Sequence, residues 1–267
     1  MSVVVIIPAR YASSRLPGKA LADIAGKPMI AHVLRRAREA RGVDRVLIAT
    51  DDDRIAAAVE REGGDAVMTR PDHASGTDRI AEVACDLSAD VIVNVQGDLP
   101  LLEAGYVESA VSALTAAGEE ADAPMMSTLA TPLLPDEAGR PQVVKVVCDR
   151  AGNALYFSRR AIPWSSQAGA RNAGTPSAAF RHIGLYAYRR PFLLELARLS
   201  PTPLEQAERL EQLRVLEHGF RIRVAVVEAS AGMIEVDTPE DLERVRERFA
   251  VRRSKEELGG TMRERHG

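Results

Sequence analysis

The chain has 267 residues, of which 46% are hydrophobic and 27% are charged, with a formal net charge of −3. A chain of this size can bury a substantial core, and its charge excludes a general affinity for nucleic acid or membrane surfaces, so any anion binding must be local. The two cysteines, Cys85 and Cys148, lie far apart and form no CxxC pair, so the sequence indicates neither a zinc site nor a disulfide framework. Their apolar surroundings predict buried, inert thiols.

The sequence opens with an aliphatic run at residues 3–7 that is too short for a lone helix and rich in β-branched residues. This pattern predicts a buried strand. No basic segment precedes the run, as a signal peptide requires, and no apolar run approaches the length of a membrane span. We therefore expect a cytoplasmic protein.

The segment after this strand is rich in cations, prolines and glycines, and it holds no carboxylate before Asp23. Its cations are Arg10, Arg15, Lys19 and Lys27. At the carboxyl end of a parallel strand, where α/β sheets bind ligands, such a loop suits a polyanion, and a nucleoside triphosphate is the obvious candidate. The alternative is a solvated basic surface, because neither a Walker A motif nor a G-x-G-x-x-G fingerprint is present. The order Pro-Ala-Arg, Ser-x-Arg, Pro-Gly-Lys favours phosphate binding.

Helices and strands alternate at short spacing through the first half of the chain. The spacing of apolar residues predicts helices over residues 29–40, 53–62 and 77–87, and strands over 45–50, 66–69 and 91–95. This alternation predicts an α/β protein with a Rossmann-like, three-layer fold, in which helices cover both faces of a mostly parallel twisted sheet.

The second half is expected to be richer in strands. Strands are predicted at 124–133, 142–149, 182–190, 221–227 and 233–236, and helices at 191–199, 203–218 and 238–249. Residues 142–160 indicate a hairpin that turns at 150–152, residues 165–179 a mobile loop, and the tail from residue 252 disorder or weak helix. We expect a single domain over 1–250, with a smaller hairpin-containing region at about 134–190, and a charged tail at 251–267.

Two aspartates follow predicted strands directly, and both are candidate metal ligands. Asp98 ends Asn-Val-Gln-Gly-Asp, and Asp237 follows residues 233–236. Mg²⁺ is held by one or two carboxylates together with substrate phosphates, which this pair could supply. The alternatives are a plain turn for Asp98 and a helix N-terminal cap for Asp237.

The segment Ser75-Gly-Thr-Asp-Arg79 precedes a predicted helix. It is either a simple N-cap or a set of donors that face a base or phosphate. The acidic run at 51–53 is interpreted as a helix cap.

Residues 7–19, I-P-A-R-Y-A-S-S-R-L-P-G-K, resemble the opening of the CMP-sugar synthetases, and in particular the 3-deoxy-manno-octulosonate cytidylyltransferase branch. The motifs S-G-T-D-R, Q-G-D, Y-F-S-R, H-I-G-L-Y, L-E-Q-L-R and V-D-T-P-E-D extend the resemblance to about residue 248. The resemblance implies Mg²⁺-dependent transfer of CMP from CTP to a 3-deoxy-2-ulosonic acid, for lipopolysaccharide synthesis, by a homodimer. From these motifs the resemblance implies four sets of site residues. CTP would be bound by Pro8, Ala9, Arg10, Arg15, Lys19, Ser75 and Arg79, and catalysis would depend on Arg10, Arg15, Lys19 and Asp98. The metal would be held by Asp98 and Asp237, and the sugar acid by Gln96, Arg159, His182, Tyr186, Glu211 and Gln212.

Residue chemistry fits the sugar assignment. Arg159 could pair with a carboxylate as a planar fork, and His182 and Tyr186, four apart on a strand, share one face. The alternative for His182 is a histidine buried in the core without a ligand. The alternative for Glu211 is a position on the solvated face of a helix. The chain departs from the family at Leu99, where well-known members have glutamate, which questions any role of that position at the metal. Rival functions are the same transfer to sialic acid or an amino-substituted acid, and a non-catalytic nucleotide sensor.

Overall fold

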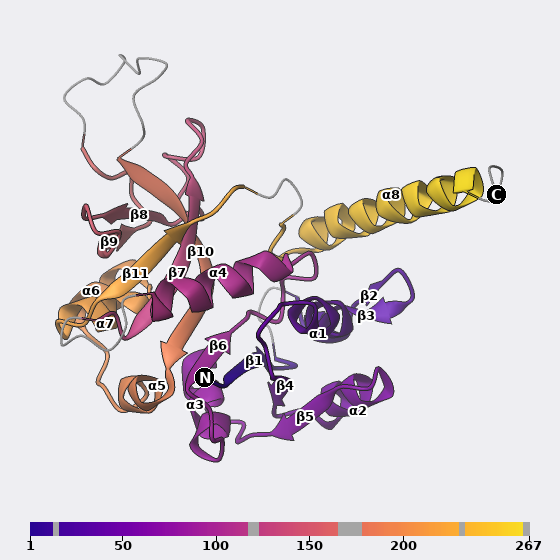
Figure 1. Cartoon of the computed structure of the whole chain (residues 1–267), viewed down its shortest axis with the longest axis horizontal. Coiled ribbons are helices and arrows are strands. Elements are labelled where there is room, and N and C mark those ends of the chain that lie inside the picture. The colour runs from indigo at the N-terminus through magenta and orange to yellow at the C-terminus, as the bar shows by residue number, and fades with distance from the viewer. Residues whose placement is uncertain (13–15, 117–122, 165–177, 230–232, 264–267) are drawn as a thin grey trace.

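A mixed, mostly parallel sheet of nine strands forms the centre of the computed structural model, with helices on both faces (Figure 1). The structure describes residues 1–12, 16–116, 123–164, 178–229 and 233–263, with side chains as far as residue 251. The strands are β1 (Val3–Ala9), β2 (Asp23–Ile24), β3 (Lys27–Pro28), β4 (Arg45–Thr50), β5 (Asp65–Met68), β6 (Val91–Asn94), β7 (Met126–Pro132), β8 (Lys145–Cys148), β9 (Ala154–Ser158), β10 (Ala179–Arg189) and β11 (Ile222–Val226). The helices are η1 (Lys19–Leu21, a 3-10 turn), α1 (Met29–Arg38), α2 (Asp53–Arg61), α3 (Gly76–Cys85), α4 (Ala104–Thr115), α5 (Arg190–Leu196), α6 (Pro203–Glu208), α7 (Gln212–Glu217) and α8 (Pro239–Arg263).

The strand order is β11-β7-β10-β6-β1-β4-β5, and only β10 runs against the other strands of this path. The hairpin of β8 and β9 joins the sheet through β10, while β2 and β3 form a separate small ribbon. The predicted fold class is confirmed, and so is the hairpin with its turn near Gly152, whose φ of 81° suits glycine.

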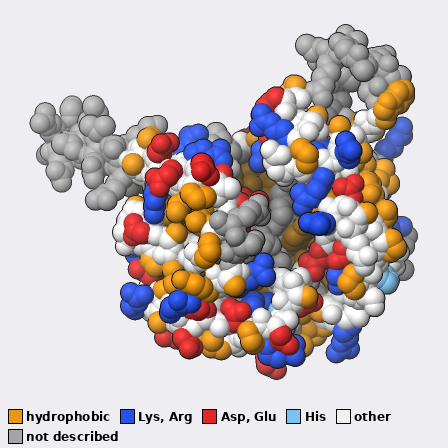
Figure 2. Space-filling model, turned by 180° about the vertical axis from the view of Figure 1, so that it is seen from behind, with side chains coloured by type: hydrophobic (Ala, Val, Ile, Leu, Met, Phe, Trp, Pro, Cys, Tyr) orange, Lys and Arg blue, Asp and Glu red, His pale blue; other side chains and the backbone are white. Residues whose placement is uncertain are grey.

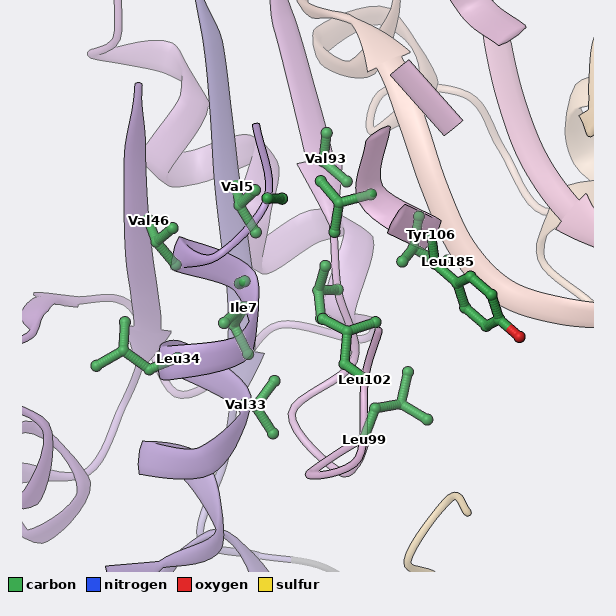
Figure 3. Packing of buried hydrophobic residues seen from close by; sticks show 14 of the residues in the cluster. Val5, Ile7, Val33, Leu34, Val46, Val93, Leu99, Leu102, Tyr106 and Leu185 are labelled. Carbon is green, nitrogen blue, oxygen red and sulfur yellow. The ribbon is translucent and has the colours of Figure 1, made fainter. Parts of the chain in front are cut away.

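The first strand shows why the sheet needs two layers of helices. Val5 and Ile7 point into a core beneath α1 and α4, whereas Val4 and Ile6 point into a second core beneath α3 and α5. Figure 3 shows the first core, where Val33 and Leu34 of α1 pack against β1. A strand buried on both faces is a continuous aliphatic run, as residues 3–7 are.

Leu99 belongs to this first core. Its side chain is 5% exposed and lies with Val33 and Leu102 in the cluster of Figure 3. Burial of this apolar side chain stabilises the core, so position 99 contributes to packing.

One helix was not predicted from the sequence. In α4, Tyr106, Val107, Ala110 and Leu114 are buried against the sheet. Their helical spacing was available in the sequence, but small and polar residues between them weaken the pattern.

Three local predictions were wrong. The helix predicted at 203–218 is two short helices, because Arg209 adopts a left-handed φ of 54° after α6. Residues 233–236 form no strand, and Val236 makes a single backbone hydrogen bond, to the carbonyl of Asp98. Both cysteines were predicted to be buried, but Cys85 is exposed at the end of α3 and Cys148 is only half-buried. Burial raises the pKa of the Cys148 thiol to about 11.

The closing helix α8 projects away from the body (Figure 1) and its backbone stays helical to Arg263, so the beginning of the tail is helix. Residues 165–177 of the predicted mobile loop lie outside the described residues. In the part of the chain that the structure describes, no helix combines the length and apolarity that crossing a membrane requires. Basic and acidic side chains are interspersed among apolar and uncharged ones on the face shown in Figure 2.

Candidate active site

The strand order reverses between β1 and β6. From β1 the chain adds β4 and then β5 on one side, and β6 then pairs with β1 on the other side. Ligands of open α/β sheets bind at such a switch point, outside the carboxyl ends of the strands. A pocket of about 300 Å³ lies there, lined by Pro8, Ala9, Arg10, Lys19, Ala20, His73, Ala74, Ser75, Gly76, Arg79, Gln96, Gly97, Asp98, Glu235 and Asp237.

The cationic loop enters this pocket through Arg10 and Lys19. Its two ends are tied together by the hydrogen bond from the Gly18 amide to the Tyr11 carbonyl, at 2.9 Å. Gly18 has a φ of 70° and lies against the Tyr11 ring, over which Arg54 stacks at 3.5 Å. Arg15 lies outside the described residues. Lys27, the fourth cation, lies outside the pocket and pairs with Glu62.

The two candidate metal ligands meet at Lys19. Its ammonium donates to Asp98 Oδ2 at 2.6 Å, to the Val236 carbonyl at 3.0 Å and to Asp237 Oδ1 at 3.3 Å. Burial alone would lower the pKa of Lys19, but the two carboxylates raise it above its usual value. Side chains separated by as many as 218 residues in the sequence therefore converge on one point.

The structure distinguishes the two interpretations of Asp237. The cap of α8 is made by its neighbours: Asp241 accepts hydrogen bonds from the amides of Asp237 and Thr238, and the Thr238 hydroxyl accepts from the Asp241 amide. The Asp237 carboxylate instead faces Lys19 in the pocket. The Asp-Thr-Pro-Glu-Asp motif thus both caps a helix and supplies a pocket carboxylate.

A third acid, which the sequence analysis missed, joins the pair. Carboxylate oxygens of Asp98, Glu235 and Asp237 lie within 4.8 Å of one another. Asp98 Oδ1 is buried and accepts no hydrogen bond, so a lone pair is available to a cation. Burial raises the pKa of Asp98, and Lys19 opposes that shift. Hard oxygen ligands with one unsatisfied buried oxygen fit a divalent ion such as Mg²⁺.

Gly97 allows the segment that follows β6 to lie close to β1 in the pocket. A Cβ at this position would lie 2.9 Å from the carbonyl oxygen of Pro8, closer than such atoms can pack. We expect Gly97→Ala to lower the free energy of unfolding by roughly 1–3 kcal/mol, measured by urea denaturation. Gly139→Ala is the control, since a Cβ there meets nothing within 4 Å; equal stabilities of the two variants would contradict the prediction.

The opposite wall of the pocket is the start of α3. Ser75 is a true N-cap, in a reciprocal box with Asp78, and also lines the pocket, so its two interpretations are compatible. Arg79 is 3% exposed and lines the pocket from behind, where it donates to Thr69 and pairs with Asp51 at 2.9 Å. The cap of α2 is Asp52, and Asp51 instead holds Arg79, a role that sequence analysis missed.

A second missed contact holds the loop before α3. The Glu82 carboxylate, on α3, bonds the His73 ring and accepts the Arg70 amide at 3.2 Å. Burial opposes ionisation of this carboxyl, but His73 and the Arg70 amide lower its pKa. Glu82 thereby fixes both ends of the turn that carries His73 and Ala74 into the pocket wall.

Most of the candidate sugar-binding residues form one polar group beside this wall. The rings of His182 and Tyr186 lie 5.6 Å apart, and the Tyr186 hydroxyl donates to Gln212 Oε1 at 3.4 Å. Glu211 Oε2 accepts from the Thr77 hydroxyl of α3 at 2.6 Å, which connects the group to the pocket. Gln96 lines the pocket itself and donates to Asn94.

Burial disfavours the charged forms of the titratable side chains in this polar group. Burial lowers the pKa of His182 to about 3, so its ring is neutral at physiological pH, and burial also raises the pKa values of Tyr186 and Glu211. Glu211 Oε1 and Gln212 Nε2 are buried without hydrogen-bond partners in the structure. Unsatisfied buried donors and acceptors are costly, and a polyhydroxylated ligand would satisfy them.

Arg159, the remaining candidate, makes its side-chain hydrogen bonds to backbone carbonyls. Its side chain donates to the carbonyls of Glu208 at 2.9 Å, Pro141 at 3.3 Å and Arg209 at 3.4 Å. Its own carbonyl accepts from the fully buried Lys145, whose pKa is lowered by burial. The guanidinium is thus held against the segment that leads into Glu211.

Comparison with known proteins identifies relatives over nearly the whole chain. A family model described as cytidylyltransferase matches residues 4–222. The 3-deoxy-manno-octulosonate cytidylyltransferase of Geobacter metallireducens is 51% identical, covering 94% of this chain and 98% of its own. That of an Anaeromyxobacter species is 54% identical, covering 93% and 97%.

Comparison with solved structures identifies similar proteins as well. The structure of a CMP:2-keto-3-deoxy-manno-octonic acid synthetase complexed with CTP is 44% identical, with a TM-score of 0.86, and covers 94% of this chain and 100% of that one. A cytidylyltransferase from Leptospira borgpetersenii, 17% identical with a TM-score of 0.61 over 92% of this chain and 85% of its own, shares the fold.

Proposed function

The chain belongs to the cytidylyltransferase family, and from this premise we propose that it transfers CMP from CTP to 3-deoxy-manno-octulosonate and releases pyrophosphate. The relatives that carry this name cover nearly the whole chain. The observation that carries the proposal is the convergence of Lys19, Asp98 and Asp237, from three distant segments, on one pocket at the switch point. The product would enter lipopolysaccharide in a cytoplasmic pathway.

Nucleotide binding is assigned to the pocket at β1. Pro8 and Ala9 form its floor, Arg10 and Lys19 meet the phosphates together with Arg15, and Ser75 and Arg79 form the facing wall. Unit charges of the same sign 4 Å apart repel by roughly 4 kcal/mol at an effective dielectric near 20, so a triphosphate approaches a sugar acid only where cations offset the repulsion. The cations assigned to the loop provide that offset.

The reaction is an in-line displacement at the α-phosphorus. The sugar hydroxyl oxygen forms the new bond to phosphorus, its proton leaves to solvent, and the bond from phosphorus to the pyrophosphate oxygen breaks. Arg10 and Lys19 stabilise the charge that develops on the leaving pyrophosphate. Mg²⁺, held by Asp98 and Asp237 with Glu235 beside them, would neutralise phosphate charge when bound.

The sugar acid is assigned to the neighbouring polar group. His182, Tyr186, Glu211 and Gln212 offer hydrogen-bond donors and acceptors for hydroxyls, and Gln96 lines the nucleotide pocket. Arg159 is proposed to bind the carboxylate.

The substrate test is pyrophosphate release with CTP and each of several acids: 3-deoxy-manno-octulosonate, its 8-amino derivative and sialic acid. We expect the first to be turned over with the highest kcat/KM. Turnover of sialic acid alone would overturn the substrate assignment, and CTP binding without turnover of any acid would favour a nucleotide sensor.

The contact between Glu82 and His73 leads to a prediction about CTP. Glu82→Ala should raise the KM for CTP by about tenfold and leave kcat and the KM of the sugar acid nearly unchanged, because it frees a turn of the nucleotide wall. The matched control is Glu108→Ala, which removes a helix glutamate that likewise accepts a backbone amide, from Arg41, far from the pocket. A KM for CTP equal in the two variants would contradict the prediction.

We also propose a homodimer that uses the region at 134–190. Three large apolar side chains there are exposed: Leu134 (57%), Leu155 (62%) and Trp164 (85%). Their burial in a dimer would stabilise the association. We propose one domain over 1–250 followed by a tail, because the nine-stranded sheet is continuous from β1 to β11. Light scattering on the purified chain measures the oligomeric state.

A further inference from the structure

Lys19 lies where a divalent ion would have to bind. An ammonium group has three hydrogens to donate, and its three acceptors here are the carboxylates of Asp98 and Asp237 and the Val236 carbonyl. These acceptors come from two segments that flank the pocket. The ammonium is therefore coordinated by oxygen on several sides, much as a metal ion is.

A metal and this ammonium cannot share the position. A divalent cation that contacts both aspartates would lie within a few ångströms of the Lys19 charge and be repelled by it. The carboxylate oxygens that already bond Lys19 would also be less available to the cation as ligands. Asp98 Oδ1, a buried oxygen of this acid pair that accepts no hydrogen bond, offers a single ligand atom and not a set. Metal binding to the nucleotide-free site is accordingly opposed by both charge and occupied ligands.

We propose that Lys19 acts as an internal counter-ion that closes the metal site until nucleotide phosphates draw its ammonium away, so that the divalent ion binds with the nucleotide or after it. This inference rests on the proposed function, because it takes the acid pair as the metal site. Lys19 begins a single 3-10 turn and its flexible four-carbon side chain lines the same pocket as Arg10, so phosphates there can compete for it. Its departure removes the Lys19 charge from the Asp98 and Asp237 carboxylates, and a divalent ion then takes its place.

The coupling must act in both directions. If the nucleotide raises the affinity for metal, the metal raises the affinity for nucleotide by the same factor. This device keeps the buried Asp98 paired in every state of the site, which avoids the high cost of an isolated buried charge.

The test is Mn²⁺ binding to the full-length protein without nucleotide, measured by electron paramagnetic resonance. Lys19→Met should bind Mn²⁺ about tenfold more tightly than wild type, although it removes a residue of the active site, because it opens the acid pair. Lys27→Met is the matched control: it removes the same charge from an exposed pair with Glu62 and should bind Mn²⁺ as wild type does. Wild type should gain Mn²⁺ affinity when a non-hydrolysable CTP analogue is added.

Two further variants keep the result interpretable. Lys19→Gln, which is neutral but polar, should also bind more tightly, and adding Asp98→Asn to Lys19→Met should abolish the gain, which locates the ion at the acid pair. Mn²⁺ affinity in both folded Lys19 variants equal to that of wild type would overturn the proposal. Tighter Mn²⁺ binding in a protein that turns over none of the sugar acids would support it and reject the proposed substrate instead.

Discussion

Replacing Asp98 by asparagine is expected to reduce turnover roughly a thousandfold while CTP binding stays detectable. The change is isosteric, but it removes the charge that faces Lys19 at 2.6 Å and the buried oxygen that is available to a cation. The phosphate contacts assigned to Arg10 and the wall at Ser75 remain in place. Pyrophosphate release gives the turnover, and calorimetry with CTP gives the affinity.

The control for this substitution is Asp65→Asn, the same change at an exposed ion pair with Arg45 at the edge of the sheet. It should behave as wild type, since exposed pairs contribute little. Retention of full activity by Asp98→Asn would refute the role of Asp98 at the metal.

The second large effect is expected at Arg159. Arg159→Ala should raise the KM of the sugar acid by about ten- to a hundredfold and change that of CTP far less, because hydrogen bonds to a charged group contribute about 1.5–3 kcal/mol. The guanidinium is held by the carbonyl of Glu208 at 2.9 Å, so little order has to be gained when a carboxylate binds. Initial rates with each substrate varied in turn separate the two constants.

Arg160→Ala tests whether charge alone explains the effect. Arg160 is the exposed next residue, and only its backbone amide is tied to Ser158. Its replacement should leave both KM values near those of wild type. An equal rise of both constants in Arg159→Ala would remove Arg159 from the sugar site.

The first half of the fold was predictable because its information is local. The aliphatic run of β1 and the helical spacing in α1 each follow from what two faces of one element must bury. The same local patterns failed where distant contacts decide the backbone. The helix predicted at 203–218 ends at Glu208, whose carboxylate accepts hydrogen bonds from the hydroxyl of Ser158, the last residue of β9, and from the amide of Arg159, which follows it.

The candidate site divides in the same way. Sequence alone determined which residues could carry charge or chemistry: the cations after the first strand, Asp98, Asp237 and the polar motifs of the second half. Only the tertiary structure decided that Lys19 bonds both aspartates and that Glu235 lies beside them. It also decided that Asp51 and Glu82 hold residues of the nucleotide wall. The burial of Leu99 in the core likewise depends on the tertiary structure. The physical reason is that residue type and spacing fix what one element can do, whereas the positions of charges relative to each other depend on which strand ends the sheet order brings together.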